Sequence, residues 1–333
     1  MRCLEFANHI SEKNVNSVFL TNSSSALERI RNKGFECVQI SENNNNALNQ
    51  IKMHISNYSA KIILFDINYH STVEQKQKYF YILQKLKKLN LFLITFEDFN
   101  NNIFPSDIVI IPYVGAESLI TKREIQINVR SQFLLGPKFF PVRKEFQILT
   151  KKQTNKFVET ILVTMGGSDP EGITLKVVNT LSRLKHNVEL IVVLGNLSTI
   201  KEKEVCIGLE NYAGNYEVIR DSNNIANLMN KSQLAITNSG LTKYEMAFMG
   251  LPAIVISNNK KHAELMDDFA SCGTIVHLGV KEEVTEEDVL LAVDELINHR
   301  KKREQMSNAG RELIDNKGIE RIINCIPEEL IYA

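Results

Sequence analysis

The chain has 333 residues, which is long enough for two domains. Its 39 Lys and Arg residues balance its 39 Asp and Glu residues, and this zero net charge gives no support for binding to nucleic acid or to an anionic membrane surface. The five cysteines are scattered without a C-x-x-C pair, which argues against a disulfide framework and a metal knot. No apolar run approaches the ~20 residues of a membrane span and no signal peptide follows Met1, so we expect a cytoplasmic protein.

The first 145 residues alternate between helical and strand patterns, beginning with a helix at 1–13. Apolar runs that end in polar or turn residues predict parallel strands covered on both faces, and 3.6-residue periodicity predicts the helices between them. This alternation predicts a doubly wound parallel sheet. The strands are predicted at 17–21, 36–40, 61–65, 91–96 and 108–111, and the helices between them at 26–33, 48–57 and 73–89.

The alternation breaks between residues 133 and 145, where Gly136, Pro137 and Pro141 interrupt it, and a polar stretch follows. We therefore predict an N-terminal domain at 1–145 and a C-terminal domain at 155–333. The fold class is α/β, with two Rossmann-like doubly wound domains and a cleft between them at the carboxyl ends of the strands. The second domain has predicted strands at 160–165, 188–194, 216–219, 234–236, 253–256 and 274–278, and helices at 170–184, 225–231, 241–249, 286–298 and 300–315.

A strand, a turn and a helix follow one another between residues 233 and 257. Asn238, Ser239 and Gly240 supply the turn, and Gly250 ends the helix. A strand that enters a helix through such a turn presents free backbone N–H groups, which favour a phosphate. The same sequence also fits a capping box between Thr242 and Glu245, which would be purely structural, and both interpretations stay open.

A second loop, Gly166-Gly-Ser-Asp-Pro170, follows the strand at 160–165. Two adjacent glycines let a backbone approach a ligand closely, and the helix behind them supplies N–H groups. The alternative is a helix cap, with Asp169 at the N-cap and Pro170 at the first helical position, but it leaves the two glycines unexplained. The loop is neither a P-loop nor a G-x-G-x-x-G fingerprint.

Taken together, GGSDP at 166–170 and TNSGLTKYEMAFMGLPAIVI at 237–256 resemble the C-terminal half of a GT-B nucleotide-sugar enzyme. More closely, they resemble the family of the pseudaminic-acid-pathway UDP-sugar hydrolase and the spore coat polysaccharide protein SpsG. The likeness extends to MRCL at 1–4, to FED at 96–98 and to LGPKFFPVRKE at 135–145, and so covers nearly the whole chain.

The resemblance implies a binding site for a UDP-sugar. The diphosphate would lie between the two loops, the ribose hydroxyls would bind Glu245, and Asn259 would lie near the sugar. The resemblance implies no metal and no cofactor. The residues assigned to the diphosphate are Gly166, Gly167, Ser168, Asp169, Ser239, Gly240, Leu241 and Thr242.

The resemblance also implies inverting hydrolysis of a UDP-linked deoxy amino sugar at its anomeric carbon, with a histidine that activates water. In the family this histidine lies in a G-x-G-H loop before MRCL, and it has no counterpart here. His70 and His262 follow predicted strands, and an imidazole has an unperturbed pKa that suits a base near neutrality. Asp66 also lies at the end of a predicted strand. A loop histidine is more often a surface residue, and that alternative stays open.

Three functions remain open from the sequence: a UDP-sugar hydrolase, a glycosyltransferase that uses the same UDP-sugar site, and a binding protein without activity. The chain begins at a helix where the family has a strand and a Gly-His loop, so we expect that this first strand is missing from the N-terminal domain. The sugar and the oligomeric state are not indicated.

Overall fold

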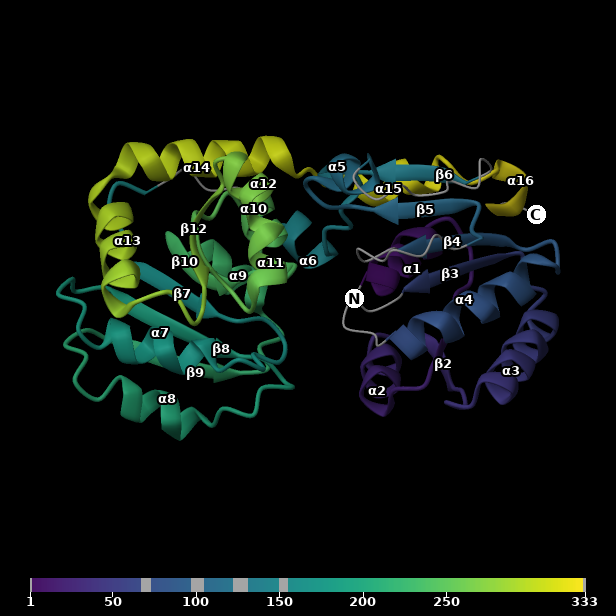
Figure 1. Cartoon of the computed structure of the whole chain (residues 1–333), viewed down its shortest axis with the longest axis horizontal. Helices are drawn as coiled ribbons and strands as arrows, with labels where there is room; N and C mark the ends of the chain where they lie inside the picture. The colour runs from purple at the N-terminus through teal and green to yellow at the C-terminus, as the bar shows by residue number, and fades with distance from the viewer. Residues whose placement is uncertain (1, 67–72, 97–104, 122–130, 150–154, 332–333) are drawn as a thin grey trace. The chain divides into compact units, whose positions relative to one another are not determined.

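The computed structural model describes residues 2–66, 73–96, 105–121, 131–149 and 155–331. Contacts divide the chain into two compact units (Figure 1). Unit 1 comprises Met1–Arg143 together with Asn316–Ala333, and unit 2 comprises Lys144–Asp315. The prediction placed the last residues in the C-terminal domain, whereas residues 316–331 pack on unit 1.

Unit 1 carries two separate parallel sheets. Strands β1 and β2 pair with each other, and β3, β4, β5 and β6 form a second sheet in that order. Side chains of β5 are buried throughout, whereas those of β1 are only half-buried at every position. The strands are β1 (Val18–Thr21), β2 (Glu36–Gln39), β3 (Ile62–Asp66), β4 (Phe92–Phe96), β5 (Ile108–Ile111) and β6 (Gln132–Leu135).

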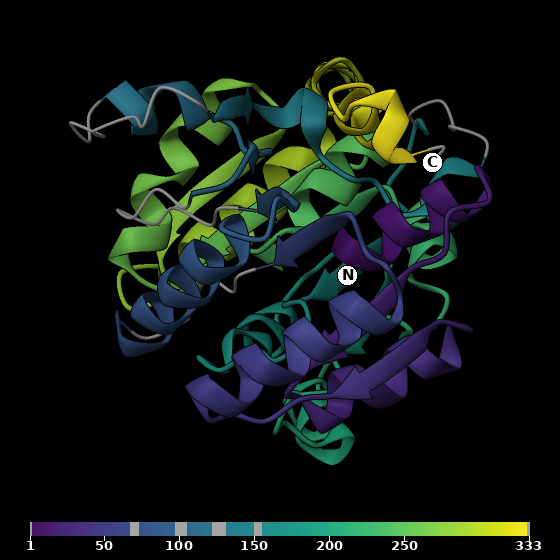
Figure 2. The same cartoon turned by 90° about the vertical axis from the view of Figure 1, so that its right-hand side faces the viewer.

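Helices on both faces hold these two sheets together as one unit. On one face, Leu4 of α1 packs with the β1–β2 cluster, while Phe6 of the same helix packs with the β4–β5 cluster. On the other face α3 and α4 lie side by side (Figure 2), and their apolar side chains contact Leu20 of β1 and Ile63 of β3. The helices are α1 (Arg2–Ser11), α2 (Ser24–Asn32), α3 (Asn44–Asn57), α4 (Val73–Lys87), α5 (Ala116–Thr121), the 3₁₀ turn η1 (Pro137–Phe139), α15 (Gly318–Ile323) and α16 (Glu328–Ile331).

The C-terminal segment completes unit 1. Ile319, Ile322 and Ile323 of α15 join the core cluster of Ile94 and Ile110, and α15 also packs on η1. Strand β6 lies in the segment where the sequence pattern breaks, so the sequence did not predict it. Its four residues are followed at once by Gly136, whose φ of 92° turns the chain out of the sheet.

Unit 2 contains one continuous sheet of six parallel strands in the order β12-β11-β10-β7-β8-β9. The chain passes from β7 outward to β8 and β9, then returns to β10 on the other side. The strand order therefore reverses between β7 and β10. The strands are β7 (Thr160–Thr164), β8 (Glu189–Leu194), β9 (Tyr216–Arg220), β10 (Leu234–Asn238), β11 (Ala253–Ser257) and β12 (Ile275–Val280).

Helices cover both faces of this sheet (Figure 1). The predicted helix at 170–184 begins only at Ile173, and the sequence did not predict α8, α11 or α12, which are short. The helices are α6 (Lys144–Gln147), α7 (Ile173–Leu181), α8 (Glu202–Gly208), α9 (Ile225–Lys231), α10 (Thr242–Met249), α11 (Lys260–Glu264), α12 (Met266–Ser271), α13 (Glu286–Asn298) and α14 (Arg300–Leu313).

Candidate functional site

The two predicted ligand loops of unit 2 follow adjacent strands at the point where the strand order reverses. Thr164 and Thr237 are in register at the carboxyl ends of β7 and β10. A carbon atom added at Cβ of Gly166 would lie 3.9 Å from Oγ1 of Thr242 and 4.0 Å from Oδ1 of Asn238. The fold therefore brings the glycine loop and the Ser239–Thr242 turn together, as ligand sites in parallel α/β sheets require.

Asn238 links the two loops. Its Nδ2 donates a hydrogen bond to the carbonyl oxygen of Met165 at 2.7 Å, and its Oδ1 accepts one from the N–H of Gly240 at 3.0 Å. From the sequence, Asn238 is predicted only as a turn residue. Its place at the carboxyl end of a central strand is the signal that could have indicated its role in joining the two loops.

The glycine loop is closely packed on one side and open on the other. Gly166 has a φ of 73°, and Gly195 lies so close behind the loop that a Cβ there would be 2.3 Å from the carbonyl oxygens of Gly166 and Gly167. A Cβ at Gly167, in contrast, would meet nothing within 4 Å, and both Gly167 and Ser168 are exposed. The backbone of the loop is thus fixed from behind and accessible from the front.

Asp169 points into its own helix. Its carboxylate is buried and accepts hydrogen bonds from the N–H groups of Ile173 and Thr174, both at 2.9 Å. Asp169 therefore caps α7 from four residues away, while Gly172 stands at the N-cap position itself and Pro170 lies outside the helix. A carboxylate already occupies the N-terminus of α7, so this geometry gives Asp169 a capping role.

Two backbone N–H groups at the end of the turn after β10 have no acceptor among the described residues. Helix α10 begins at Thr242 with Leu241 at the N-cap and no side-chain cap, so the predicted capping box between Thr242 and Glu245 is not formed. Within the part of the chain that the structure describes, the N–H groups of Leu241 and Thr242 meet no acceptor, and Oγ of Ser239, whose residue is only 8% exposed, has no partner. Uncapped donors at a helix start favour an anion.

Glu245 and Lys243 occupy the first turn of α10 in different ways. Glu245 is half-buried, at the position to which the resemblance assigns the ribose hydroxyls. Lys243 is only 4% exposed, and its Nζ donates to the carbonyl oxygens of Ser239 and Gly240, each at 2.9 Å. Burial lowers the pKa of Lys243 to about 7. No local sequence pattern indicates that Lys243 is buried, because its burial depends on packing against Phe269 of α12.

The loop after β11 holds Asn259 and His262. Oδ1 of Asn259 accepts a hydrogen bond from the backbone N–H of His262 at 3.0 Å and thereby caps α11. In the same layer, the fully buried hydroxyl of Ser257 lies 2.9 Å from Nε2 of His277. Burial is the main cause that lowers the pKa of His277 below its usual range.

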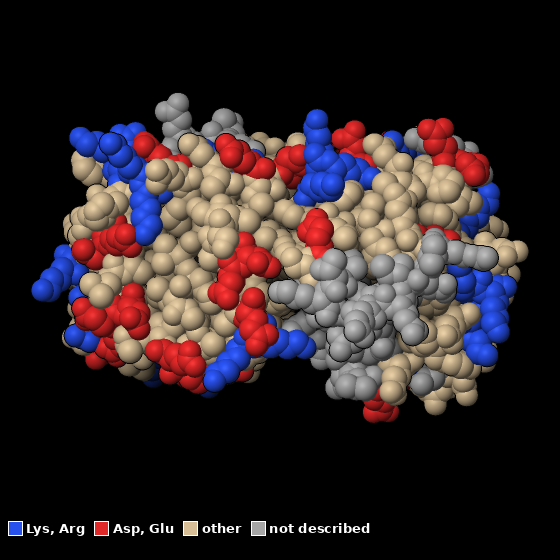
Figure 3. Space-filling view, turned by 45° about the horizontal axis from the view of Figure 1, so that its top comes forward, with Lys and Arg blue, Asp and Glu red and all other residues tan. Residues whose placement is uncertain are grey.

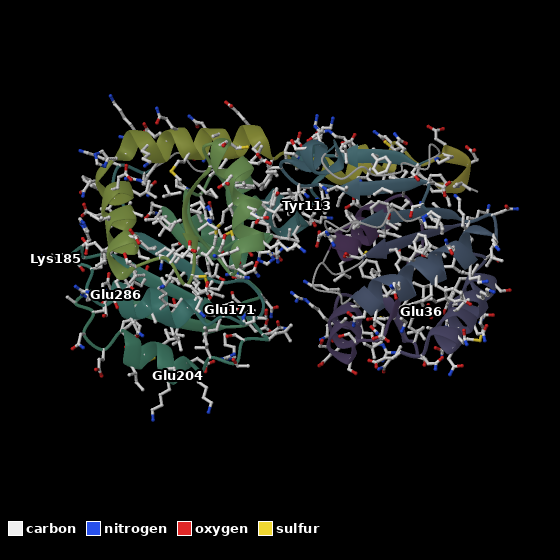
Figure 4. The ribbon with its side chains drawn as sticks, in the orientation of Figure 1. Glu36, Tyr113, Glu171, Lys185, Glu204 and Glu286 are labelled. Carbon is white, nitrogen blue, oxygen red and sulfur yellow. The ribbon has the colours of Figure 1, made fainter. Side chains whose placement is uncertain are left out.

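In unit 1 the described candidate is Asp66, at the end of β3. Its carboxylate forms an ion pair with the guanidinium of Arg2, which also donates to the hydroxyl of Tyr113 (labelled in Figure 4) and lies 4.8 Å from the ring centroid of Phe96. Burial and the charge of Asp66 raise the pKa of Cys3. The other candidate base, His70, lies outside the described residues.

Charged side chains of both signs are interspersed over the face of the molecule in Figure 3, in agreement with the balanced composition. Near the candidate site, Glu171 and Lys281 form an ion pair at 3.5 Å between the loops after β7 and β12 (Glu171 is labelled in Figure 4). A cavity lined by Gln233, Leu251 and Arg311 lies at the opposite, amino ends of β10 and β11 and is not part of this site.

In the ranges that the structure describes, no helix is both long and apolar enough to cross a membrane.

The chain is similar to known proteins over much of its length. The sequence pattern of the glycosyltransferase family 28 C-terminal domain matches residues 160–322, which include both loops. The uncharacterized protein MJ1062 of Methanocaldococcus jannaschii is 28% identical over 83% of this chain, and the chain spans only 56% of its length. The spore coat polysaccharide biosynthesis protein SpsG of Bacillus subtilis is 27% identical over 72% of this chain and 71% of its own.

Among solved structures, UDP-GlcNAc 2-epimerase from Neisseria meningitidis bound to UDP-GlcNAc is similar, with a TM-score of 0.66 and 13% identity over 97% of this chain and 95% of its own. MurG from Acinetobacter baumannii and a glycosyltransferase from Rickettsia africae share the fold as well, with TM-scores of 0.67 and 0.65. The predicted GT-B-like α/β fold, with two Rossmann-like units, is thereby confirmed. At 12–14% identity, these structures show the fold alone.

Proposed function

We propose that this chain is an enzyme of polysaccharide biosynthesis that binds a UDP-linked amino sugar in unit 2 and breaks the bond between the anomeric carbon and the diphosphate. The observation that carries the proposal is the meeting of two loops at the reversal of strand order, with the exposed backbone of Gly167 on one side and the free N–H groups of Leu241 and Thr242 on the other. The family pattern and the UDP-GlcNAc complex of a protein with this fold support it.

In this proposal the diphosphate lies against Gly166, Gly167 and Ser168 and on the turn from Ser239 to Thr242. The N–H groups would donate to the phosphate oxygens, and the hydroxyls of Ser239 and Thr242 lie beside them. Glu245 would accept hydrogen bonds from the ribose hydroxyls. Asn259 would hold the sugar side, although its Oδ1 also caps α11.

Hydrolysis is the first reaction we propose, as the sequence resemblance implies. Water attacks the anomeric carbon, the carbon–oxygen bond to the β-phosphate breaks, and UDP leaves with the electron pair. His262 is the described candidate for the base that takes the proton from the water. Transfer to a sugar acceptor is the second candidate, because the matching pattern is that of a glycosyltransferase domain.

Substitution of Gly167 tests the diphosphate site. A Cβ at Gly167 meets nothing within 4 Å, so Gly167→Val is expected to fold normally and to obstruct a phosphate at the backbone. We expect the affinity for UDP, measured by titration calorimetry, to fall at least tenfold, while the affinity for uridine changes little. Gly34→Val in unit 1 is the control: a φ of 84° makes it strained, so it should lower the melting temperature and leave UDP binding unchanged.

Glu245→Gln tests the ribose assignment. The loss of a charged hydrogen bond should weaken the binding of UDP and of uridine equally, by about 1–3 kcal/mol. A lower melting temperature with unchanged UDP affinity would show that Glu245 has only a structural role. Free sugar and UDP formed without an acceptor would identify a hydrolase, and turnover only with an acceptor would identify a transferase.

A further inference from the structure

Lys243 lies behind the turn that we assign to the diphosphate. Its Nζ donates to the carbonyl oxygens of Ser239 and Gly240. The carbonyl of Gly240 belongs to the same planar peptide as the N–H of Leu241, and in a trans peptide these two groups point in opposite directions. Lys243 therefore holds the back of a peptide whose N–H group has no acceptor in the described chain.

The positive charge of Lys243 is not compensated by the protein. No carboxylate in the described parts of the chain forms an ion pair with its amine, and burial is the cause that lowers its pKa. The rings of Tyr244 and Phe269 lie 4.8 and 5.2 Å from Nζ. A buried ammonium without a counter-ion is costly, so the neutral amine is favoured in the empty site.

Other titratable and charged groups lie on the elements packed around Lys243. His277 of β12 bonds to Ser257; burial lowers its pKa, the charge of Asp267 of α12 raises it, and the charge of Lys243 lowers it. On α14, Arg311 packs against Gly250 at the far end of α10, and Arg303 donates to backbone carbonyls. Lys231 of α9 is paired with Glu189. Among the described residues, none of these groups forms an ion pair with the amine of Lys243.

We propose that Lys243 is the cation of this diphosphate site: it binds a proton when the diphosphate binds and so couples nucleotide affinity to pH. The inference rests on the proposed function and adds a residue and a regulation that the sequence resemblance does not contain. Lys243 acts through the turn and is a positioning and charge-compensating residue.

The expected coupling follows from distance. A phosphate oxygen bonded to the N–H of Leu241 would lie ~7 Å from Nζ of Lys243, across one peptide unit. At that distance the attraction between unit charges in a partly buried site is enough to raise the pKa of Lys243 by about one unit. With a pKa of about 7 in the empty site, binding at pH 7.5 would then take up about half a proton, and affinity would fall about fivefold between pH 7 and pH 9.

Titration calorimetry with UDP at pH 7, 8 and 9, in two buffers of different ionisation enthalpy, measures both quantities. The terminal phosphate of UDP is almost fully ionised across this range, so it contributes little to the slope. For the wild type we expect about half a proton taken up near pH 7.5 and a fivefold loss of affinity at pH 9. Uridine, which lacks the phosphates, should bind without proton uptake.

Lys243→Met should keep the apolar packing and remove the amine. We expect it to bind UDP at every pH as the wild type does at pH 9 or more weakly, without proton uptake. Lys176→Met is the matched control, because Lys176 also donates to two backbone carbonyls, of Lys281 and Val284, but behind a different loop. That variant should keep the wild-type slope and proton uptake.

UDP that binds the wild type with no pH slope and no proton uptake overturns this inference and leaves the proposed function standing. A slope that persists in Lys243→Met overturns it as well. A wild type that does not bind UDP at any pH overturns the proposed function, and the inference with it.

Discussion

Both units bury a basic side chain beside the carboxyl ends of their strands, and the two are compensated in different ways. In unit 1 the guanidinium of Arg2 forms an ion pair with Asp66, the last residue of β3. In unit 2 the amine of Lys243 bonds only to backbone carbonyls, and in the described residues it has no ion-pair partner. Arg2 has a carboxylate partner in the protein, whereas we propose that a bound ligand supplies the negative charge beside Lys243.

The sheets of the two units also differ in continuity. Unit 2 has one sheet of six strands that brings two candidate ligand loops together, whereas unit 1 has two sheets with helices packed on both faces and half-buried side chains on β1 and β3. In unit 1 the buried guanidinium has a partly exposed carboxylate partner within the protein. In unit 2 we propose that a ligand takes the corresponding place beside Lys243.

The largest effect should come from breaking the pair in unit 1. Asp66→Ala removes a partly exposed carboxylate partner of the buried guanidinium of Arg2, and we expect the free energy of unfolding to fall by about 3 kcal/mol, at the lower end of the cost of breaking a buried pair. Urea denaturation followed by circular dichroism measures this. The double variant Arg2→Met/Asp66→Ala should recover most of the loss. A single variant as stable as the wild type would remove the distinction between the two units.

A smaller effect is expected from the pH dependence of stability in unit 2. The pKa of Lys243 is lowered from its ordinary value of 10.5 to about 7 in the folded chain, so between these values the unfolded chain holds the extra proton. The free energy of unfolding should therefore rise with pH, by about 2 kcal/mol from pH 7 to pH 9. Subtracting the same curve for Lys243→Met isolates this contribution, and two parallel curves would contradict it.

The smallest effect concerns Asp169, which caps α7. Asp169→Asn loses one of the two bonds to the helix N-terminus and the negative charge, and we expect a loss of about 1 kcal/mol in urea denaturation. Asp288→Asn, in the exposed capping box of α13, is the control and should cost less. The pH slope of UDP affinity should stay unchanged in Asp169→Asn. A lost slope would show that Asp169, instead of the ligand, compensates Lys243.

The alternation of strands and helices, the parallel sheets and the two loops could be predicted from the amino-acid sequence alone. These features rest on local signals: apolar runs of strand length, helical periodicity, and turn residues such as Gly166 and Gly240 directly after a strand. That the two loops serve one ligand was implied by the family resemblance, and their proximity depends on the adjacency of β7 and β10 in the sheet.

Which polar residues are buried, and what they bond, could not be predicted from the sequence. The side chain of Asp169 turns inward to α7, Asn238 joins two loops 73 residues apart, and Lys243 packs against Phe269 of α12. The C-terminal segment packs on unit 1 for the same reason. Burial and charge compensation depend on contacts between elements far apart in the chain, and no local pattern encodes which of those elements meet.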